Sequence, residues 1–256
     1  MTDKTPTQGI ALVTGAAKRI GRAIAHGLAS AGWDVAIHFH RSVADAEMLK
    51  KEITELGRRA VTLQADLAQA VEVEGLIQRC ADQLGAPTCL VNNASVFHFD
   101  EIGSVVSQKW DAMQATNLRA PIILARDFAK HLPANTEGNI INLLDQKIAN
   151  LNPDFFSYTI GKVGLAAATH MMAMALAPRI RVNAIAPGLT LVSGDQTPEN
   201  FAAAHRMTPL GRAGNADDIV AAVLFLVQTK SVTGQTIFID GGQRLMPLDR
   251  DVMYKV

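Results

Sequence analysis

The chain has 256 residues, 48% of them hydrophobic, and its 24 basic side chains balance its 24 acidic ones. This length supports one large domain with a sizeable core. The zero formal charge argues against nucleic-acid binding and against an electrostatic membrane anchor. Cys80 and Cys89 form no metal-ligand or redox motif. The first nine residues hold no apolar signal core. The apolar stretch 163–177 is too short to span a bilayer. We therefore expect a protein of the reducing cytoplasm that makes no membrane contact.

Short apolar runs alternate with segments of helical spacing along the whole chain. The runs are mostly continuous, as expected for strands covered on both faces of a parallel sheet. We predict strands at 10–14, 34–39, 60–64, 88–93, 139–144, 180–185 and 235–240, and helices at 19–31, 43–57, 69–84, 107–131, 156–177 and 216–228. This order predicts an α/β fold: a single Rossmann-type doubly wound domain over residues 1–256, with a seven-stranded parallel sheet flanked by helices.

The first predicted strand leads into a glycine-containing turn. In "TGAAKRIG", Gly15 and Gly21 flank the turn, and Arg19 stands where many glycine fingerprints have another glycine. Glycine lets backbone N–H groups approach a pyrophosphate, and the helix N-terminus adds a favourable partial charge. Glycines also occur in such turns for steric reasons alone. In the first strand–helix unit of a seven-strand pattern, we interpret this turn as a dinucleotide site.

The end of the second predicted strand indicates which dinucleotide binds. Enzymes that use NAD often place an acid there, on the ribose 2′-hydroxyl, whereas this chain reads "IHFHRS". A cationic pocket suits a 2′-phosphate, so we predict NADPH as the cofactor. The predicted pocket combines the first turn with this strand end: Lys18, Arg19, His38, Arg41 and Ser42. Alternatively, Arg41 only caps a surface strand. His38 and His40 could suggest a metal site, but they lack a third nearby ligand, so we predict no metal site.

Tyr158 and Lys162 lie four residues apart, on one face of the predicted helix 156–177. The start of this helix lies beside the carboxyl ends of the strands, where such folds bind ligands. We expect the ammonium of Lys162 to lower the pKa of Tyr158, so that the phenol exchanges protons near neutral pH. Alternatively, Tyr158 is a partly buried tyrosine and Lys162 a solvated lysine.

With these motifs in order, the sequence resembles the short-chain dehydrogenase/reductase family over residues 9–245. The matching elements are "TGAAKRIG" at 14–21, "AD" at 65–66, "NNAS" at 92–95, Asn117, "YTIGK" at 158–162, "NAIAPG" at 183–188 and "DGG" at 240–242. The resemblance implies one domain that holds both cofactor and catalytic residues. It implies that Asp66 binds the adenine, that Asn117 holds a water relaying protons through Lys162, and that Lys162 binds the nicotinamide ribose. The other positions implied in cofactor binding are Gly15, Ile20, Gly21, Leu67, Asn93, Ala94, Ser95, Tyr158, Pro187 and Gly188.

Two departures from the usual family pattern resemble the pteridine reductase branch. Arg19 replaces a glycine, and Asp145 replaces the usual serine thirteen residues before Tyr158. "HFHRS", "NNASVF" and "PGLTL" point the same way. In that branch the arginine touches cofactor phosphate and pterin, the phenylalanine stacks on the pterin, and aspartate and tyrosine supply protons. The substrate residues implied here are Arg19, Ser95, Phe97, Asp145 and Tyr158.

The residues themselves support a reason for the acid. A pterin carries several N–H donors, and a carboxylate accepts from them; if burial raises its pKa, it also delivers a proton to a ring nitrogen. We therefore expect NADPH-dependent reduction of a dihydropterin or related pteridine, with Asn117, Asp145, Tyr158 and Lys162 as catalytic residues. Alternatively, Asp145 only pairs with Lys147 or Arg19, and Phe97 is a core aromatic.

Two other functions stay open. One is a general short-chain carbonyl or 3-oxoacyl reductase, in which Asp145 is incidental. The other is a catalytically silent cofactor-binding protein, against which the intact Asn117, Tyr158 and Lys162 argue. From the family and from the Ala- and Met-rich helix 156–177 we expect a homotetramer, with a dimer as the alternative. Residues 189–215 suggest a lid, and the tail "LMPLDRDVMYKV" borders a neighbouring site or does nothing.

Overall fold

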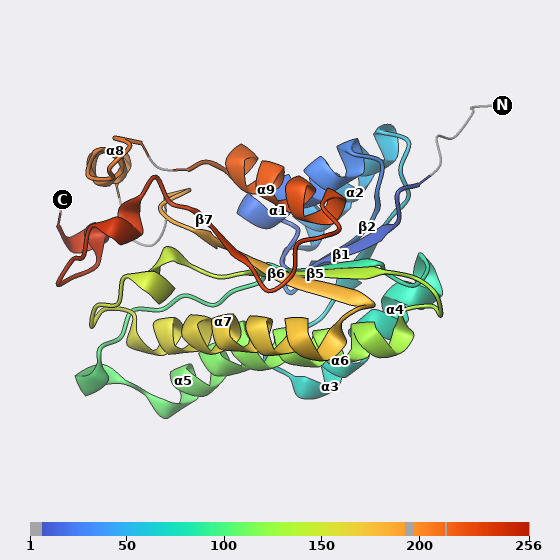
Figure 1. Cartoon of the computed structure of the whole chain (residues 1–256), viewed down its shortest axis with the longest axis horizontal. Coiled ribbons are helices and arrows are strands. Elements are labelled where there is room, and N and C mark those ends of the chain that lie inside the picture. The colour runs from blue at the N-terminus through green and yellow to red at the C-terminus, as the bar shows by residue number, and fades with distance from the viewer. Residues whose placement is uncertain (1–6, 193–196, 213, 256) are drawn as a thin grey trace.

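The computed structural model describes residues 7–192, 197–212 and 214–255 of the chain. Its centre is a parallel sheet of seven strands in the order β3-β2-β1-β4-β5-β6-β7 (Figure 1). The strands are β1 Ile10–Val13, β2 Asp34–Phe39, β3 Ala60–Gln64, β4 Cys89–Asn92, β5 Gly138–Leu143, β6 Ile180–Pro187 and β7 Thr236–Ile239. Each predicted strand is confirmed to within two residues, and so is the doubly wound fold.

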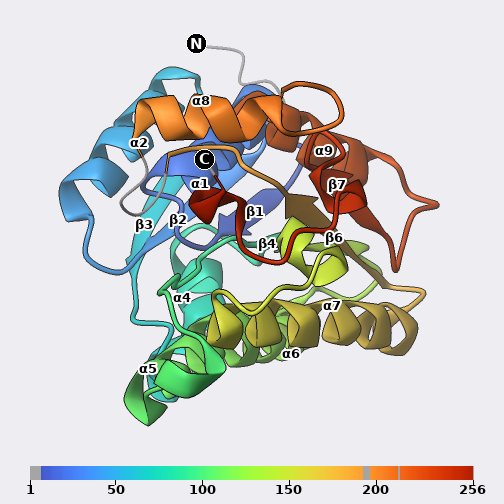
Figure 2. The same cartoon turned by 90° about the vertical axis from the view of Figure 1, so that its left-hand side faces the viewer.

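Helices cover both faces of the sheet, with α1, α2 and α9 on one face and α3 to α7 on the other (Figures 1 and 2). The α-helices are α1 Arg19–Ser30, α2 Val43–Glu55, α3 Ala70–Glu74, α4 Leu76–Gln83, α5 Ser107–Gln114, α6 Ala120–His131, α7 Phe156–Leu176, α8 Pro198–Arg206 and α9 Ala216–Gln228. The predicted helix 69–84 breaks at Gly75. The predicted helix 107–131 has a π-helical turn, Ala115–Arg119, in its middle.

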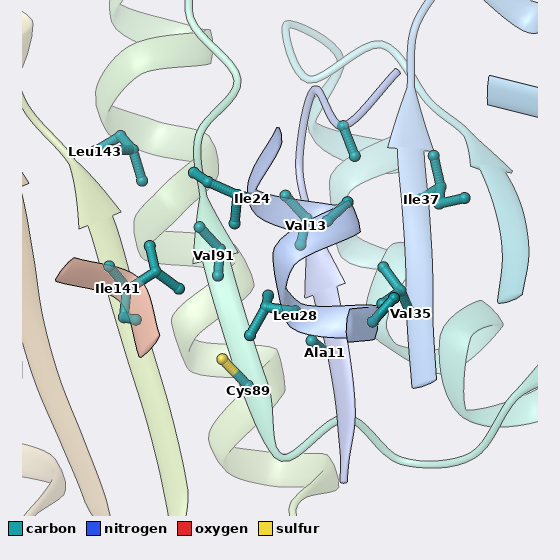
Figure 3. Close-up of a cluster of buried hydrophobic side chains, with 14 of the residues drawn as sticks. Ala11, Val13, Ile24, Leu28, Val35, Ile37, Cys89, Val91, Ile141 and Leu143 are labelled. Atoms are coloured by element: carbon teal, nitrogen blue, oxygen red, sulfur yellow. The ribbon is translucent and has the colours of Figure 1, made fainter. Parts of the chain in front are cut away.

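The core explains why the strands are continuous apolar runs. Successive strand residues point to opposite faces, so Ala11 and Val13 pack beneath α1 while Leu12 packs toward α4 and α6. Figure 3 shows Ile24 and Leu28 of α1 lying over β1 and β4. Both cysteines belong to this core, where burial raises the pKa of each thiol to about 12. They are therefore inert packing residues.

The helix α7 ends one residue before the predicted helix 156–177 does. It runs for 21 residues, and by length and composition it is one helix of the described chain that could cross a membrane. The stretch 163–177, which was predicted to be too short to span a bilayer, lies mostly within this longer helix. In the fold, α7 lies beside α6 along the sheet and packs on β6 (Figure 1). A core helix of an α/β domain passes the same test of length and composition.

Two segments that follow the last strands gather at the same end of the molecule (Figure 1). One is α8, within the predicted lid 189–215; residues 193–196 and 213 of that prediction lie outside the described residues. The other is the chain after β7, with 3-10 turns at Gln243–Leu245 and Val252–Tyr254. The second turn packs against α8. This end of the molecule is where the strands have their carboxyl ends.

Candidate functional site

The turn between β1 and α1 depends on two glycines. Gly15 has a φ of +61°, in the left-handed region that favours glycine. A Cβ on Gly21 would lie 2.2 Å from the carbonyl oxygen of Gly15 and 2.5 Å from the side chain of Asn93. Only glycine therefore lets α1 begin this close to the strand, with its first N–H groups facing the open end of the sheet.

Hydrogen bonds from β4 hold this turn in place. The amide of Asn93 donates to the carbonyl oxygens of Thr14 at 2.8 Å and Gly15 at 3.2 Å. In return, the Thr14 hydroxyl accepts from the backbone N–H groups of Asn93 and Ala94. The ends of two neighbouring strands are thus fixed to each other where a ligand would lie across them.

His38 supports the turn from β2. The backbone N–H of Gly15 donates to its Nδ1 at 3.0 Å, so Nε2 carries the proton and donates to Ala65 O at 3.1 Å. Burial lowers the pKa of His38 to about 4, and the ring is neutral at neutral pH. The prediction that His38 adds positive charge to a phosphate pocket is wrong. Its part is to fix the carbonyl and N–H pattern of the turn.

A hollow opens above this turn, and we call it the turn hollow. Of the predicted cofactor residues, it is lined by Gly15, Lys18, Arg19, Ile20, Gly21, His38, Asp66, Leu67, Asn93, Ala94 and Ser95. Arg41 and Ser42 line an adjoining hollow that shares Lys18 and Asp66 with it. Lys18 forms an exposed ion pair with Asp45 at 3.0 Å. Cationic side chains therefore stand at the end of β2 where other dinucleotide sites place an acid.

Arg19 connects the turn hollow with a second hollow. Its φ of 54° is rare for a residue with a Cβ and matches a position that many related turns fill with glycine. The guanidinium donates to the carbonyl oxygen of Val192 at 2.9 Å. Arg19 thus touches the segment after β6, and its exposed side chain borders both hollows.

We call the second hollow the tyrosine hollow, because Tyr158 and Asp145 meet in it. The hydroxyl of Tyr158 donates to Asp145 Oδ2 at 2.8 Å, and the backbone N–H of Lys147 donates to Asp145 Oδ1 at 2.9 Å. Asp145 lies in the turn after β5 and Tyr158 in the first turn of α7. Predicted site residues that also line this hollow are Arg19, Ile20, Asn93, Ser95, Phe97, Lys162, Pro187 and Gly188.

Burial opposes ionisation of both the acid and the phenol. Burial raises the pKa of Asp145, against the opposing Lys147 N–H bond. The pKa of Tyr158 lies well above its ordinary value because of burial and the Asp145 carboxylate. The predicted lowering of the Tyr158 pKa is therefore wrong, because burial and Asp145 raise it. The ionisation of Tyr158 and that of Asp145 are therefore coupled through their hydrogen bond.

Lys162 is buried beneath the phenol. Its ammonium donates to the carbonyl oxygen of Leu143 at 2.7 Å and lies 5.7 Å from the centre of the Tyr158 ring. Burial lowers its pKa to about 8, although the Asp145 carboxylate opposes this. Lys162 thus carries a positive charge at neutral pH that balances the buried carboxylate.

Aromatic rings form one wall of the tyrosine hollow. Phe97 stacks on Phe155 with ring centres 4.2 Å apart and meets the Tyr158 ring edge-on at 4.7 Å. Phe97 keeps part of its surface exposed to the hollow. The alternative that it is only a core aromatic accounts for the stack on Phe155 but not for this exposure. A flat ring has a face to stack on here.

Asn117 lies in the π-helical turn and outside both hollows. Its Oδ1 accepts from the backbone N–H of Val96 at 2.8 Å and from the Ser95 hydroxyl at 3.1 Å, while its Nδ2 donates to Val96 O. The side chain therefore fixes the loop that carries Ser95 and Phe97. The proton-relay role expected for Asn117 stays a prediction.

Sequence reasoning missed part of the tyrosine hollow. Asp251, Val252 and Met253, from the tail, line it together with Gln146 and Lys147. No local motif marks these residues, because the tail reaches the hollow through contacts more than ninety positions distant in sequence. Within the described ranges, no group of three or more histidine, cysteine, aspartate or glutamate side chains has the geometry of a metal site.

Comparisons with known proteins match nearly the whole chain. A family model described as "Enoyl-(Acyl carrier protein) reductase" matches residues 15–244. A protein named short-chain dehydrogenase/reductase eriH, of Hericium erinaceus, is 34% identical over 246 residues, which is 92% of this chain and 98% of that protein. The 3-oxoacyl-[acyl-carrier-protein] reductase FabG of Staphylococcus aureus is 35% identical over 240 residues, 91% of this chain and 96% of FabG.

Two solved structures are more similar still. Both are FolM alternative dihydrofolate reductase 1 complexed with NADP, and both are 44% identical to this chain. The Brucella canis structure superposes with a TM-score of 0.89 over 93% of this chain and 95% of its own. The Brucella suis structure gives a TM-score of 0.91 over 95% and 98%.

Proposed function

The chain belongs to the short-chain dehydrogenase/reductase family, in its pteridine reductase-like branch, and we propose that it is an NADPH-dependent reductase of a dihydropterin or related pteridine. The observation that carries this proposal is the buried Asp145 carboxyl hydrogen-bonded to the Tyr158 hydroxyl. A ketone offers one oxygen and needs one neutral donor. A pterin edge offers several N–H groups, and a carboxylate accepts from them.

NADPH, when bound, supplies the hydride that reduces a C=N bond of the substrate. The side chains of the tyrosine hollow supply the matching proton to the nitrogen, from the Tyr158 hydroxyl or the Asp145 carboxyl. The positive charge of Lys162 favours the carboxylate form of Asp145. Phe97 orients a flat ring by stacking. Arg19 borders both hollows and is placed to contact substrate and cofactor together.

Support for NADPH comes from the turn and from the end of β2. The close approach of Gly21 to Gly15 leaves room for a pyrophosphate at the start of α1. Lys18, Arg41 and Ser42 offer donors for a 2′-phosphate, and the FolM structures hold NADP. In this proposal Asp66 binds the adenine, Asn93 and Ala94 lie along the cofactor, and Pro187 and Gly188 border the nicotinamide.

The exposed surface of α7 supports a proposal about the assembly. Ile160, Val163, Met171 and Met174 are exposed along it, and such a face suits a partner helix. We propose a homotetramer, with a dimer as the alternative, of a single-domain cytoplasmic enzyme. A monomer by light scattering would contradict this part of the proposal.

The test is reduction of 7,8-dihydrobiopterin, 7,8-dihydromonapterin and 7,8-dihydrofolate, followed by loss of NADPH absorbance. NADH and no-substrate reactions serve as controls, and a 3-oxoacyl thioester tests the reductase chemistry of the FabG relatives. Asp145→Ser is expected to lower pterin turnover by about a hundredfold, within the range of a lost general acid. Thioester reduction without any pterin turnover, or an unimpaired Asp145→Ser, would contradict the proposed function.

A further inference from the structure

We propose that the C-terminal segment Arg250–Tyr254 forms a wall of this chain's own substrate site, and that Asp251 is a positioning residue acting on Asp145 through Lys147. This inference rests on the proposed function for the identity of the substrate. The wall itself rests on contacts within the one chain, and it differs from a tail that borders a neighbouring site.

The segment is fastened to the domain by an ion pair between a buried carboxylate and a half-exposed guanidinium. The Arg250 guanidinium donates to both oxygens of Asp154 at 2.8 to 2.9 Å, and the Asp154 side chain is fully buried. The backbone N–H of Asp251 donates to the same carboxylate at 2.6 Å. These bonds keep the pKa of Asp154 low against the opposing effect of burial. The segment is therefore anchored at its first two residues.

Aromatic contacts fasten its other end. The Tyr254 ring lies stacked 6.3 Å from Phe155 and meets Phe99 edge-on at 5.6 Å. Phe155 is the residue on which Phe97 stacks. The last turn of the tail thus supports the aromatic wall from behind.

Between these anchors, Asp251 reaches the proton-handling acid in two steps. Its carboxylate accepts from the Lys147 ammonium at 2.8 Å, with 3% and 11% of the lysine and aspartate side chains exposed. Lys147 also bonds Asn152, and its backbone N–H donates to Asp145. Asp251 therefore holds the lysine, and the lysine backbone holds the carboxyl of Asp145.

The pair also sets the charge around Asp145. The titratable and charged groups that line the hollow with Asp145 are Tyr158 and Lys162 from α7, Lys147 from the turn after β5, Asp251 from the tail and Arg19. Lys147 favours the charged form of Asp145, and Asp251 disfavours the charged form of Tyr158. Without Asp251, a buried ammonium would be left uncompensated next to the acid.

The next two residues line the tyrosine hollow. Val252 is buried and Met253 partly buried. An unbranched, polarizable side chain such as methionine adapts to the edge of a ring. Met253 is therefore expected to limit the size of the substituent that the pterin carries.

The experiment compares Asp251→Asn with Asp249→Asn, two residues away. Asp249 is exposed, pairs with Lys255 and lines neither hollow. For Asp251→Asn we expect the KM for 7,8-dihydrobiopterin to rise at least about tenfold, because breaking a buried pair leaves a bare charge. The Kd of NADPH, measured by its fluorescence, should stay within about twofold because the turn hollow holds no tail residue.

The pH profile separates positioning from simple structural damage. Removing the Asp251 charge favours deprotonation of Asp145 and Tyr158, so the alkaline fall of kcat/KM should move to lower pH by about one unit. The double variant Lys147→Met/Asp251→Asn removes the bare ammonium. It should reverse most of this shift and return the pH profile toward that of the wild type. An unchanged KM and pH profile in Asp251→Asn, equal to those of Asp249→Asn, would overturn the proposal.

Met253→Ala provides a second, independent arm. It should lower the KM for substrates with large substituents relative to small ones, and equal effects on both would also count against the wall. If Asp251→Asn does not fold, the double variant and Met253→Ala carry the test. If the wild-type protein reduces no dihydropterin, the proposed function fails, and the same variants are compared on the 3-oxoacyl thioester.

Discussion

The two hollows of this molecule are built in different ways. The turn hollow rests on neutral hydrogen bonds and close backbone contacts among Thr14, Gly15, His38 and Asn93. The tyrosine hollow rests on buried charges, with Asp145, Lys147, Lys162 and Asp251 within one small volume. The turn hollow is a surface of fixed backbone groups, which suits the phosphates of the proposed cofactor. The tyrosine hollow is a set of coupled proton positions, so the two are expected to fail independently.

We expect Tyr158→Phe to impair the tyrosine hollow and leave the turn hollow intact, with the largest effect of the variants. Loss of the hydroxyl removes a proton donor and leaves Asp145 without one of its partners, so kcat should fall by about 10²- to 10⁴-fold. Stopped-flow single-turnover measurements check this, with the Kd of NADPH from fluorescence as control. A Kd for NADPH that rises as much as kcat falls would show that the two hollows are not independent.

Gly21→Ala should do the opposite and impair the turn hollow. The added Cβ would lie 2.2 Å from the backbone oxygen of Gly15, so α1 must move away from the strand. We expect the Kd of NADPH to rise by about a hundredfold, since orientation of the phosphate contacts is lost. Gly75→Ala is the matched control, because a Cβ there meets nothing within 4 Å. Equal cofactor affinities in the two variants would contradict the steric argument for the turn.

Acidification affects the turn through His38, whose pKa is lowered to about 4 by burial. Between pH 6.5 and 4 the unfolded chain binds a proton that the folded chain excludes, so stability falls as pH falls through this range. The loss attributable to His38 at pH 5 is about 2 kcal/mol. Urea unfolding at pH 7 and pH 5, for the wild type and for His38→Asn, measures it. A wild-type loss no larger than that of His38→Asn would argue against the neutral ring.

The sequence predicts the turn hollow better than the tyrosine hollow. Gly15 and Gly21 lie in one short strand–helix turn, so their spacing in the chain indicates that they lie close together. Asn93 directly follows β4, which pairs with β1. His38 was placed correctly but given the wrong charge, because its burial and its bond to Gly15 arise only when β2 lies beside β1.

In the tyrosine hollow, Tyr158 was predicted from its place at the start of a helix beside the strand ends, and Asp145 and Phe97 were added through the resemblance to pteridine reductases. The sequence predicted the wrong direction for the pKa of Tyr158, because that pKa depends on desolvation by the whole fold. It also did not predict the tail. The Arg250–Asp154 pair joins residues 96 positions apart, and no local pattern contains that distance.

Arg19 illustrates a tension between heat resistance and selectivity. A residue with a Cβ at φ 54° carries backbone strain of roughly 1 kcal/mol that a glycine would relieve. Screening variants for thermal survival alone would therefore favour Arg19→Gly, a robust enzyme lacking the one guanidinium shared by both hollows. Directed evolution of this scaffold needs a pterin-dependent growth selection at every round to keep that side chain.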